Sequence, residues 1–178
     1  MPRKRSLKAL LGKRDTPAIA ERLLGASLVR RWKGEIMIYP ITEVEAYDGF
    51  TDRASHASRG KTKRNAIMFG KPGHWYVYFT YGMHWMLNIV TGPKDYPAAV
   101  LIRGVGDISG PARLTKQLHI TGALNGALAS RRSGLWIVLN DPPRRKDIVR
   151  TARIGVNYAG LVWSKKKYRF VLKTEKSK

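Results

Sequence analysis

Cysteine is absent from the 178-residue chain, and acidic residues are scarce. Without cysteine the chain has neither a disulfide framework nor a thiolate metal site. The 12 Asp and Glu residues stand against 34 Lys and Arg residues, which gives a formal net charge of +22 at pH 7. A compact domain with this charge repels itself unless an anion lies nearby. The imbalance therefore predicts an anionic partner, with nucleic acid first, and an anionic membrane surface or a larger assembly as alternatives.

Long hydrophobic runs are also missing. In the basic segment Met1–Lys13 the longest apolar run is Ala9–Leu11, whereas the core of a signal peptide needs about 7–15 apolar residues. The most hydrophobic stretch, 75–90, contains polar residues and falls short of the ~20 residues of a membrane-spanning helix. We therefore expect a soluble cytoplasmic protein with no membrane partner.

Apolar residues make up 43% of the chain and can fill a core, so the sequence predicts one folded domain over 15–178. Residues 1–14 form a basic arm that we expect to be poorly ordered. Strands are expected at 27–32, 35–40, 42–47, 75–80, 85–90, 98–103, 135–139 and 168–172. Helices are expected from an N-cap at Thr16 to Gly25, over 110–120 and, as a short piece, over 148–153. Many strands and few helices indicate an α+β fold.

The strand at 42–47 places a carboxylate and an aromatic ring on one surface. Alternation along a strand puts Glu43, Glu45 and Tyr47 on the same face. The positive field of the chain should keep Glu45 ionised at neutral pH, which suits a general base that activates water. The alternative is a structural salt bridge with one of the many arginines. Arg103, at the end of an apolar strand, needs a carboxylate partner when it is buried, and Glu45 is a candidate.

The two aromatic-rich strands at 75–80 and 85–90 predict a hairpin with Tyr81 at or beside its tip. Tyr81 either folds back onto the domain or acts as a wedge that enters the minor groove of DNA and separates base steps. A wedge implies that a nucleotide is turned out of the stack into a pocket with aromatic walls. Tyr47, His56 and Tyr78 are candidates for those walls, with packing in the core as the alternative for each.

Metal chemistry has little support in the sequence. The histidines His56, His74, His84 and His119 form no i,i+4 pair and no HExxH pattern. The sequence likewise shows no phosphate-cradling glycine motif and no pattern typical of a serine nucleophile.

Several ordered segments carry a resemblance to a known family. They are EVEAY at 43–47, SHASRGKTKRN at 55–65, MFGKPG at 68–73 and YVYFTYGMHWMLN at 76–88, with ERLLG at 21–25, Arg103, GPARL at 110–114 and RIGV at 153–156 around them. The chain resembles the alkyladenine DNA glycosylase family, also called 3-methyladenine or methylpurine DNA glycosylases. The likeness covers most of the chain outside its termini.

The resemblance implies hydrolysis of the N-glycosidic bond of a damaged purine in double-stranded DNA, the first step of base excision repair. Expected substrates are 3-methyladenine and also 7-methylguanine, hypoxanthine and ethenoadenine. The family fold is a single α+β domain around a curved antiparallel sheet with a protruding hairpin. A monofunctional, monomeric enzyme that uses water is expected, with no metal and no organic cofactor.

The resemblance also assigns roles to individual residues. Glu45 matches the general base, while Arg103 and the Val156 carbonyl match groups that hold the attacking water. Tyr81 matches the intercalating tyrosine. The residues that match the base pocket are Tyr47, His56 and Tyr78, which sandwich the base, and Asn88, which crowds the exocyclic amine of normal guanine.

Two features leave the range of lesions open. His84 and Trp85 follow the hairpin tip at positions where other members vary, and the long N-terminal extension of animal members is missing, which indicates a prokaryotic form. A non-catalytic nucleic-acid binder also explains the charge. It leaves the pairing of Glu45 with Tyr47 on one strand face unexplained.

Overall fold

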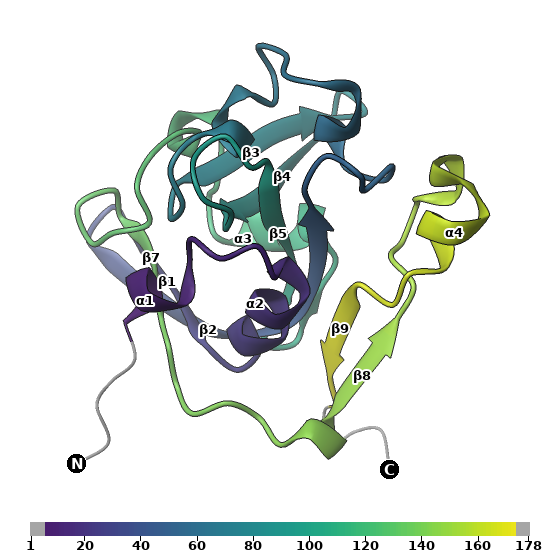
Figure 1. Cartoon of the computed structure of the whole chain (residues 1–178). Coiled ribbons are helices and arrows are strands. Elements are labelled where there is room, and N and C mark those ends of the chain that lie inside the picture. The colour runs from purple at the N-terminus through teal and green to yellow at the C-terminus, as the bar shows by residue number, and fades with distance from the viewer. Residues whose placement is uncertain (1–5, 174–178) are drawn as a thin grey trace.

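The computed structural model describes residues 6–173, in which nine strands form an antiparallel sheet (Figure 1). The strands are β1 (Ser27–Trp32), β2 (Glu35–Asp48), β3 (Trp75–Thr80), β4 (His84–Val90), β5 (Ala98–Val105), β6 (Ile108–Ser109), β7 (Leu135–Val138), β8 (Ile148–Thr151) and β9 (Arg169–Leu172). The helices are α1 (Leu7–Leu10), α2 (Thr16–Leu23), α3 (Pro111–Gln117) and α4 (Gly160–Lys165). Short 3-10 turns are η1 (His56–Arg59), η2 (Ala66–Phe69), η3 (Gly122–Leu124), η4 (Arg145–Asp147) and η5 (Asn157–Ala159). The predicted α+β class is confirmed.

The long strand β2 joins the two halves of the sheet. The sheet order is β3-β4-β5-β2-β1-β7, with β6 beside β5, and β9 beside both β2 and β8. The first half of β2 pairs with β1, and its second half pairs with β5 and β9. Register shifts between Ile41 and Val44 mark a bulge, which bends a strand and increases its twist. The sequence predicted two strands here, whereas the structure has one bent strand.

The main core lies between the sheet and α2, which packs on β2 (Figure 1). Leu23, Leu24, Leu87 and Ile102 are among its fully buried members. Fully burying one such side chain contributes about 1.5–3 kcal/mol to the hydrophobic driving force. The sheet that carries the candidate site residues therefore has a rigid backing.

The N-terminal segment differs from the expected arm. Residues 1–5 lie outside the described part of the chain, but α1 follows directly, and Leu11 is only 8% exposed within the main core. The Gly12 amide donates to the Thr91 carbonyl over 2.8 Å. The described portion of the predicted arm is thus part of the domain, because its leucines have apolar surface to bury.

The N-cap of helix α2 lies one residue earlier than expected. Asp15 is the N-cap and accepts a hydrogen bond from the Ala18 amide at 3.1 Å, while Thr16 is the first helical residue. The Thr16 hydroxyl instead donates to Asp48 Oδ1 over 2.7 Å. Asp and Thr are both good N-caps. Asp15 is the cap here because the Thr16 hydroxyl is bonded to Asp48 instead.

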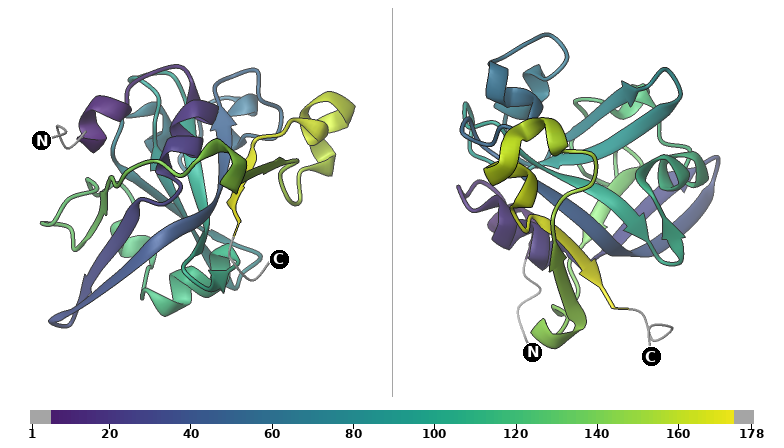
Figure 2. Two further views of the ribbon diagram at one scale, coloured as in Figure 1. Left: turned by 90° about the horizontal axis from the view of Figure 1, so that it is seen from below. Right: turned by 90° about the vertical axis from the view of Figure 1, so that its right-hand side faces the viewer.

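The C-terminal part of the chain adds a second hairpin to β2. Residues Ile148–Thr151 were predicted to be helical, but they form β8 and pair with β9. The prediction was wrong because the partner strand lies some twenty residues further along the chain, beyond the reach of local pattern. This hairpin and α4 lie together on one side of the molecule, whereas the β1–β2 hairpin projects from another (Figure 2, left). Segment 152–158 is thereby brought to Glu45 and Ala46, near the C-terminal end of β2.

Candidate functional site

A cavity of about 350 Å³ opens between the β3–β4 hairpin, the loop after β2 and segment 154–158. Its aromatic lining consists of Tyr47, His56, Tyr76, Tyr78, Tyr81, His84 and Tyr158. Asn88, Arg103 and Val156 also line it. Of the predicted site residues, all but Glu45 contribute to this lining. The volume lies within the range of about 300–1,000 Å³ that is typical of small-molecule sites.

The aromatic wall is built from rings in mutual contact. The ring centroids of His56 and Tyr78 are 4.8 Å apart at an interplanar angle of 68°, and those of Tyr76 and Tyr78 are 5.1 Å apart. Such tilted and edge-to-face pairs contribute about 0.5–1.5 kcal/mol beyond their burial. The Arg64 guanidinium lies over the Tyr78 ring, 5.0 Å from its centroid. A planar aromatic ligand entering the cavity would meet preformed ring faces.

The protonation states of the side chains in this wall suit a cationic ligand. Desolvation at the cavity wall, with the Arg64 charge second, lowers the pKa of His56 below its usual 6.5, so the imidazole is neutral at pH 7. Its Nδ1 lies 3.2 Å from the Tyr76 hydroxyl oxygen. Burial raises the pKa of Tyr76 to about 12 and raises that of Tyr78 further, so both phenols stay neutral. Neutral rings attract cations through their faces.

Glu45 lies directly behind this lining rather than on its surface. The side chain has no solvent exposure, and the carboxylate contacts three residues that do line the cavity. The Ile154 amide donates to Oε1 over 2.7 Å, and the Tyr47 hydroxyl donates to Oε2 over 2.9 Å. Arg103 Nε is 3.5 Å from Oε1. The predicted shared strand face of Glu45 and Tyr47 is confirmed, but Glu45 was expected on the cavity surface and is one layer deeper.

Arg103 has a closer carboxylate partner than the one predicted. Its Nε donates to Glu43 Oε1 over 2.9 Å, shorter than its 3.5 Å approach to Glu45. Arg169 Nε donates to the same oxygen of Glu43 over 2.7 Å. Glu43 thus balances two guanidinium groups, and Arg103 is fixed between two carboxylates. The predicted contact of Arg103 with Glu45 is present, whereas the closer contact with Glu43 was not predicted.

Burial and neighbouring charges act in opposite directions on Glu45. Burial is the largest effect and raises the pKa of its carboxyl above the usual 4.5. The Arg103 charge, the Ile154 amide, the Tyr47 hydroxyl and the Arg153 charge lower the pKa in turn. The positive field acts as the sequence predicted, but burial outweighs it. A carboxyl with a raised pKa has a stronger tendency to accept a proton, which suits a base.

A buried ion pair that sequence reasoning missed supports this arrangement. Arg153 bonds both oxygens of Asp52, at 2.5 and 2.8 Å, and both side chains have no exposure. Arg153 also donates to the Ala46 carbonyl, and its guanidinium lies over the Tyr47 ring, 4.8 Å from the centroid. Removing one partner of such a pair typically costs about 3–5 kcal/mol. The pair therefore holds Arg153, which directly precedes Ile154, against the ring of Tyr47.

Asn88 and Tyr158 complete the cavity wall. The Asn88 side-chain amide donates to the Tyr76 carbonyl over 3.0 Å, which fixes its orientation in β4. The Tyr158 hydroxyl donates to the Ala54 carbonyl over 2.8 Å. Tyr158 was not predicted, although it lies only two residues beyond the RIGV segment that ends at Val156.

Tyr81 stands at the tip of the β3–β4 hairpin. It is 86% exposed, so the alternative that it folds back onto the core is wrong. Its backbone is left-handed, with φ 52°, and Gly82 follows with φ 64°. This conformation costs a residue other than glycine roughly 1–2 kcal/mol. The turn therefore holds a large aromatic side chain outward at the edge of the cavity.

Between residues 6 and 173 no group of three or more His, Cys, Asp or Glu side chains is arranged to hold a metal ion. In the same part of the chain, none of the helices has both the length and the apolarity needed to cross a membrane.

Comparison with known proteins gives a consistent family. The family model for methylpurine-DNA glycosylase (MPG) matches residues 11–108 and 106–176. A protein of Carboxydothermus hydrogenoformans is 44% identical over 182 residues, which cover 92% of this chain and 93% of that protein. One from Methanocella arvoryzae is 44% identical over 83% of this chain and 82% of its own length, and both are named "Putative 3-methyladenine DNA glycosylase". The chain belongs to the methylpurine-DNA glycosylase family.

Proposed function

We propose that this chain is a monofunctional DNA glycosylase that removes damaged purines from duplex DNA by hydrolysis. The observation that carries the proposal is a carboxylate, Glu45, held by Arg103, the Ile154 amide and the Tyr47 hydroxyl behind an aromatic cavity. Family membership and the names of the relatives support 3-methyladenine as a substrate. The same cavity would admit 7-methylguanine, hypoxanthine and ethenoadenine.

In this proposal the extruded base enters between the rings of Tyr47, His56 and Tyr78. A purine alkylated at a ring nitrogen carries positive charge, and the neutral ring faces attract it. Asn88, fixed by its bond to the Tyr76 carbonyl, occupies the space that the exocyclic amine of normal guanine would need. Selectivity then follows from charge attraction and from steric exclusion.

The proposed reaction uses one water molecule. Glu45 accepts a proton from water, the water oxygen bonds to the sugar C1′, and the bond from C1′ to the purine nitrogen breaks with its electron pair leaving on the purine. Arg103 and the Val156 carbonyl orient the water. Because Glu45 has no exposed surface, the proposal requires the Tyr47 side of the wall to open when a nucleotide binds. General-base assistance of this kind contributes about 10²–10⁴-fold to the rate.

Tyr81 is proposed to fill the space in the duplex that the extruded nucleotide leaves. Separating a base step costs a few kcal/mol. Phosphate contacts by a domain with a net charge of +22 offset this cost. The 86% exposure of Tyr81 makes its ring available for this role before DNA binds.

The decisive experiment replaces Glu45 with Gln, which keeps the size of the side chain and removes its basicity. Base release is measured under single-turnover conditions on duplexes carrying one hypoxanthine or one ethenoadenine, and on DNA treated with a methylating agent. We expect the rate to fall by about 10²–10⁴-fold. Glu35→Gln, on the exposed β1–β2 turn, is the matched control and should retain full activity.

Two outcomes would contradict the proposal. Unchanged release by Glu45→Gln would show that another group is the base. Binding that does not depend on a lesion, with no base release from any damaged duplex, would instead support the non-catalytic nucleic-acid binder.

A further inference from the structure

Exposed apolar side chains gather in the segment that follows Val156. Tyr158 is 66% exposed, Leu161 79% and Val162 68%. Together they form what we call the η5–α4 ridge, defined as Tyr158, Leu161 and Val162. No described element packs over Leu161 or Val162, and α4 stands away from the body of the sheet (Figure 1). Such a concentration of exposed apolar surface is typical of a contact site.

The ridge is firmly attached to the rim of the cavity. Trp163 packs inward on the small cluster of Ala54, Val156 and Ala159, and its carbonyl lies 3.4 Å from Arg153 Nη2. Tyr158 lines the cavity and is bonded to the Ala54 carbonyl. Because Trp163 faces inward, its helical neighbours Leu161 and Val162 face solvent. The exposure of the ridge is therefore a consequence of how α4 is anchored.

A second apolar projection also borders the cavity. Tyr81 and Met83 at the tip of the β3–β4 hairpin are 86% and 68% exposed. Tyr81 and Tyr158 line the same cavity. The entrance is therefore bordered by apolar side chains from two separate parts of the chain.

The charges beside the ridge indicate what covers it. Lys165, Lys166 and Lys167 follow it directly, and all are exposed. A nucleotide that enters the cavity remains bonded to its duplex, so the duplex must lie across the entrance. Lysines suit its phosphates, and aliphatic side chains suit the sugar edges and base steps of a minor groove. A duplex with a nucleotide turned out meets both requirements.

We propose that the η5–α4 ridge is a second DNA-contact element, which packs into the minor groove beside the extruded nucleotide while Tyr81 enters from the hairpin side. This inference rests on the proposed function and extends it to a surface outside the cavity. The two projections would hold the distorted duplex from both sides of the entrance, with the neighbouring lysines on the phosphates.

The test replaces Leu161 and Val162 together with Ser. Affinity for a lesion-containing duplex is measured by fluorescence anisotropy in the Glu45→Gln background, so that binding is separated from base release. We expect affinity to fall roughly 10-fold, since lost burial of about 1.4 kcal/mol corresponds to that factor. The matched control is Ile36→Ser with Ile38→Ser, which are 58% and 61% exposed on the β1–β2 hairpin and should leave affinity unchanged.

Salt dependence distinguishes the ridge from its charged neighbours. The Leu161/Val162 variant should bind more weakly at every salt concentration with an unchanged slope of log affinity against log salt. Lys165→Gln should reduce that slope by about 0.9 for one lost phosphate contact. A changed slope in the Leu161/Val162 variant would overturn the assignment of an apolar contact.

Further outcomes separate this inference from the proposed function. Thermal unfolding checks that the Ser variant is folded. If it is not folded, the variant Leu161→Ala with Val162→Ala replaces it, because alanine favours helix. Wild-type affinity in a folded variant overturns the ridge. If the protein with Glu45 intact releases no damaged base, the proposed function fails, whereas the anisotropy series still decides whether the ridge contacts DNA.

Discussion

At the scale of single residues, Glu45 combines a buried position with an ionisable group. Burial raises its carboxyl pKa above the usual 4.5, even though Arg103 and other neighbours act against burial. Base catalysis needs the ionised form, which exists above the raised pKa. We therefore expect the single-turnover rate to decline as the pH falls through a value above 4.5. Glu45→Gln should lose this limb of the profile, whereas an acid limb at the ordinary glutamate value would contradict the buried position.

The same shift predicts a dependence of stability on pH. A carboxyl whose pKa is higher in the folded than in the unfolded state contributes most to stability below its unfolded value, and this contribution is lost as the pH rises through the folded value. The unfolding free energy of the wild type, relative to Glu45→Gln, should therefore decrease as the pH is raised from about 4.5. Urea unfolding of both proteins over this range measures the difference.

Residue identity and spacing predicted part of the site. Alternation placed Glu45 and Tyr47 on one face, and their 2.9 Å hydrogen bond confirms it. The pair of Asp52 and Arg153 lies 101 residues apart along the chain, and no local pattern relates the two. Whether Glu45 faces the cavity or lies behind its lining depends on where Tyr47 and Ile154 meet, which only the folded chain determines.

At the scale of elements, the β3–β4 hairpin was the most predictable feature. Two aromatic strands and a tight turn indicated it, and the structure confirms both strands and the exposed tip. The strands expected at 35–40 and 42–47 form the single strand β2, in which Pro40 has no amide to donate. Pairing with β1 ends at Pro40 and pairing with β5 begins at Ile41, so the missing amide falls where the strand changes partners.

Substitutions at the tip and at the base of the hairpin should differ in their effect on stability. Tyr81→Ser should alter the unfolding free energy by less than about 0.5 kcal/mol, because the tip is exposed. It should also weaken retention of the extruded nucleotide, measured with 2-aminopurine beside the lesion. Trp75→Ala, at the buried base of β3, should cost about 3–5 kcal/mol. A large loss of stability from Tyr81→Ser would mean that the tip supports the fold instead.

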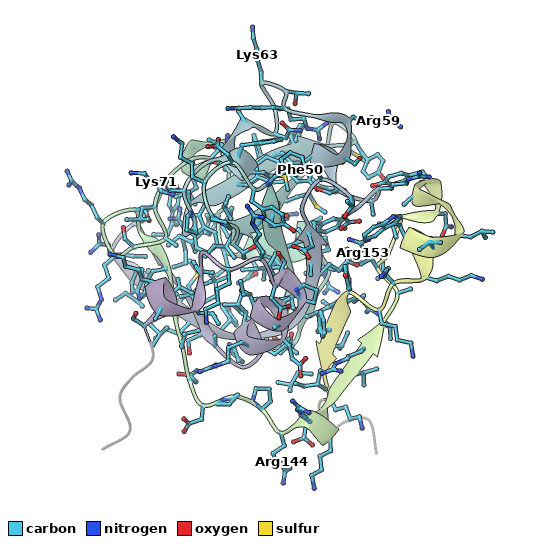
Figure 3. All side chains as sticks on the ribbon, in the orientation of Figure 1. Phe50, Arg59, Lys63, Lys71, Arg144 and Arg153 are labelled. Atoms are coloured by element: carbon cyan, nitrogen blue, oxygen red, sulfur yellow. The ribbon has the colours of Figure 1, made fainter. Side chains whose placement is uncertain are left out.

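At the scale of the whole molecule, positive charge is spread widely. Arg59 and Lys63 lie at one end, Arg144 at the opposite end and Lys71 on another side (Figure 3). With a net charge of +22, such a distribution attracts DNA from many directions before any specific contact forms. Affinity for undamaged duplex should fall steeply with salt, with a slope of roughly −0.9 for each phosphate contacted. An anisotropy titration at several salt concentrations measures this, and a flat response would contradict phosphate binding.

Several residues of the candidate site belong to the part of the chain that is synthesised late. The Ile154 amide, the Val156 carbonyl and the Arg153 guanidinium all come from the last quarter of the sequence, and β9, which pairs with β2 beside Glu45, comes later still. Ribosomes deliver these residues last. A chain that lacks these residues retains Glu45 but has no Ile154 amide to donate to its carboxylate. Under the proposed function, a chain that ends before Arg153 would therefore release no damaged base.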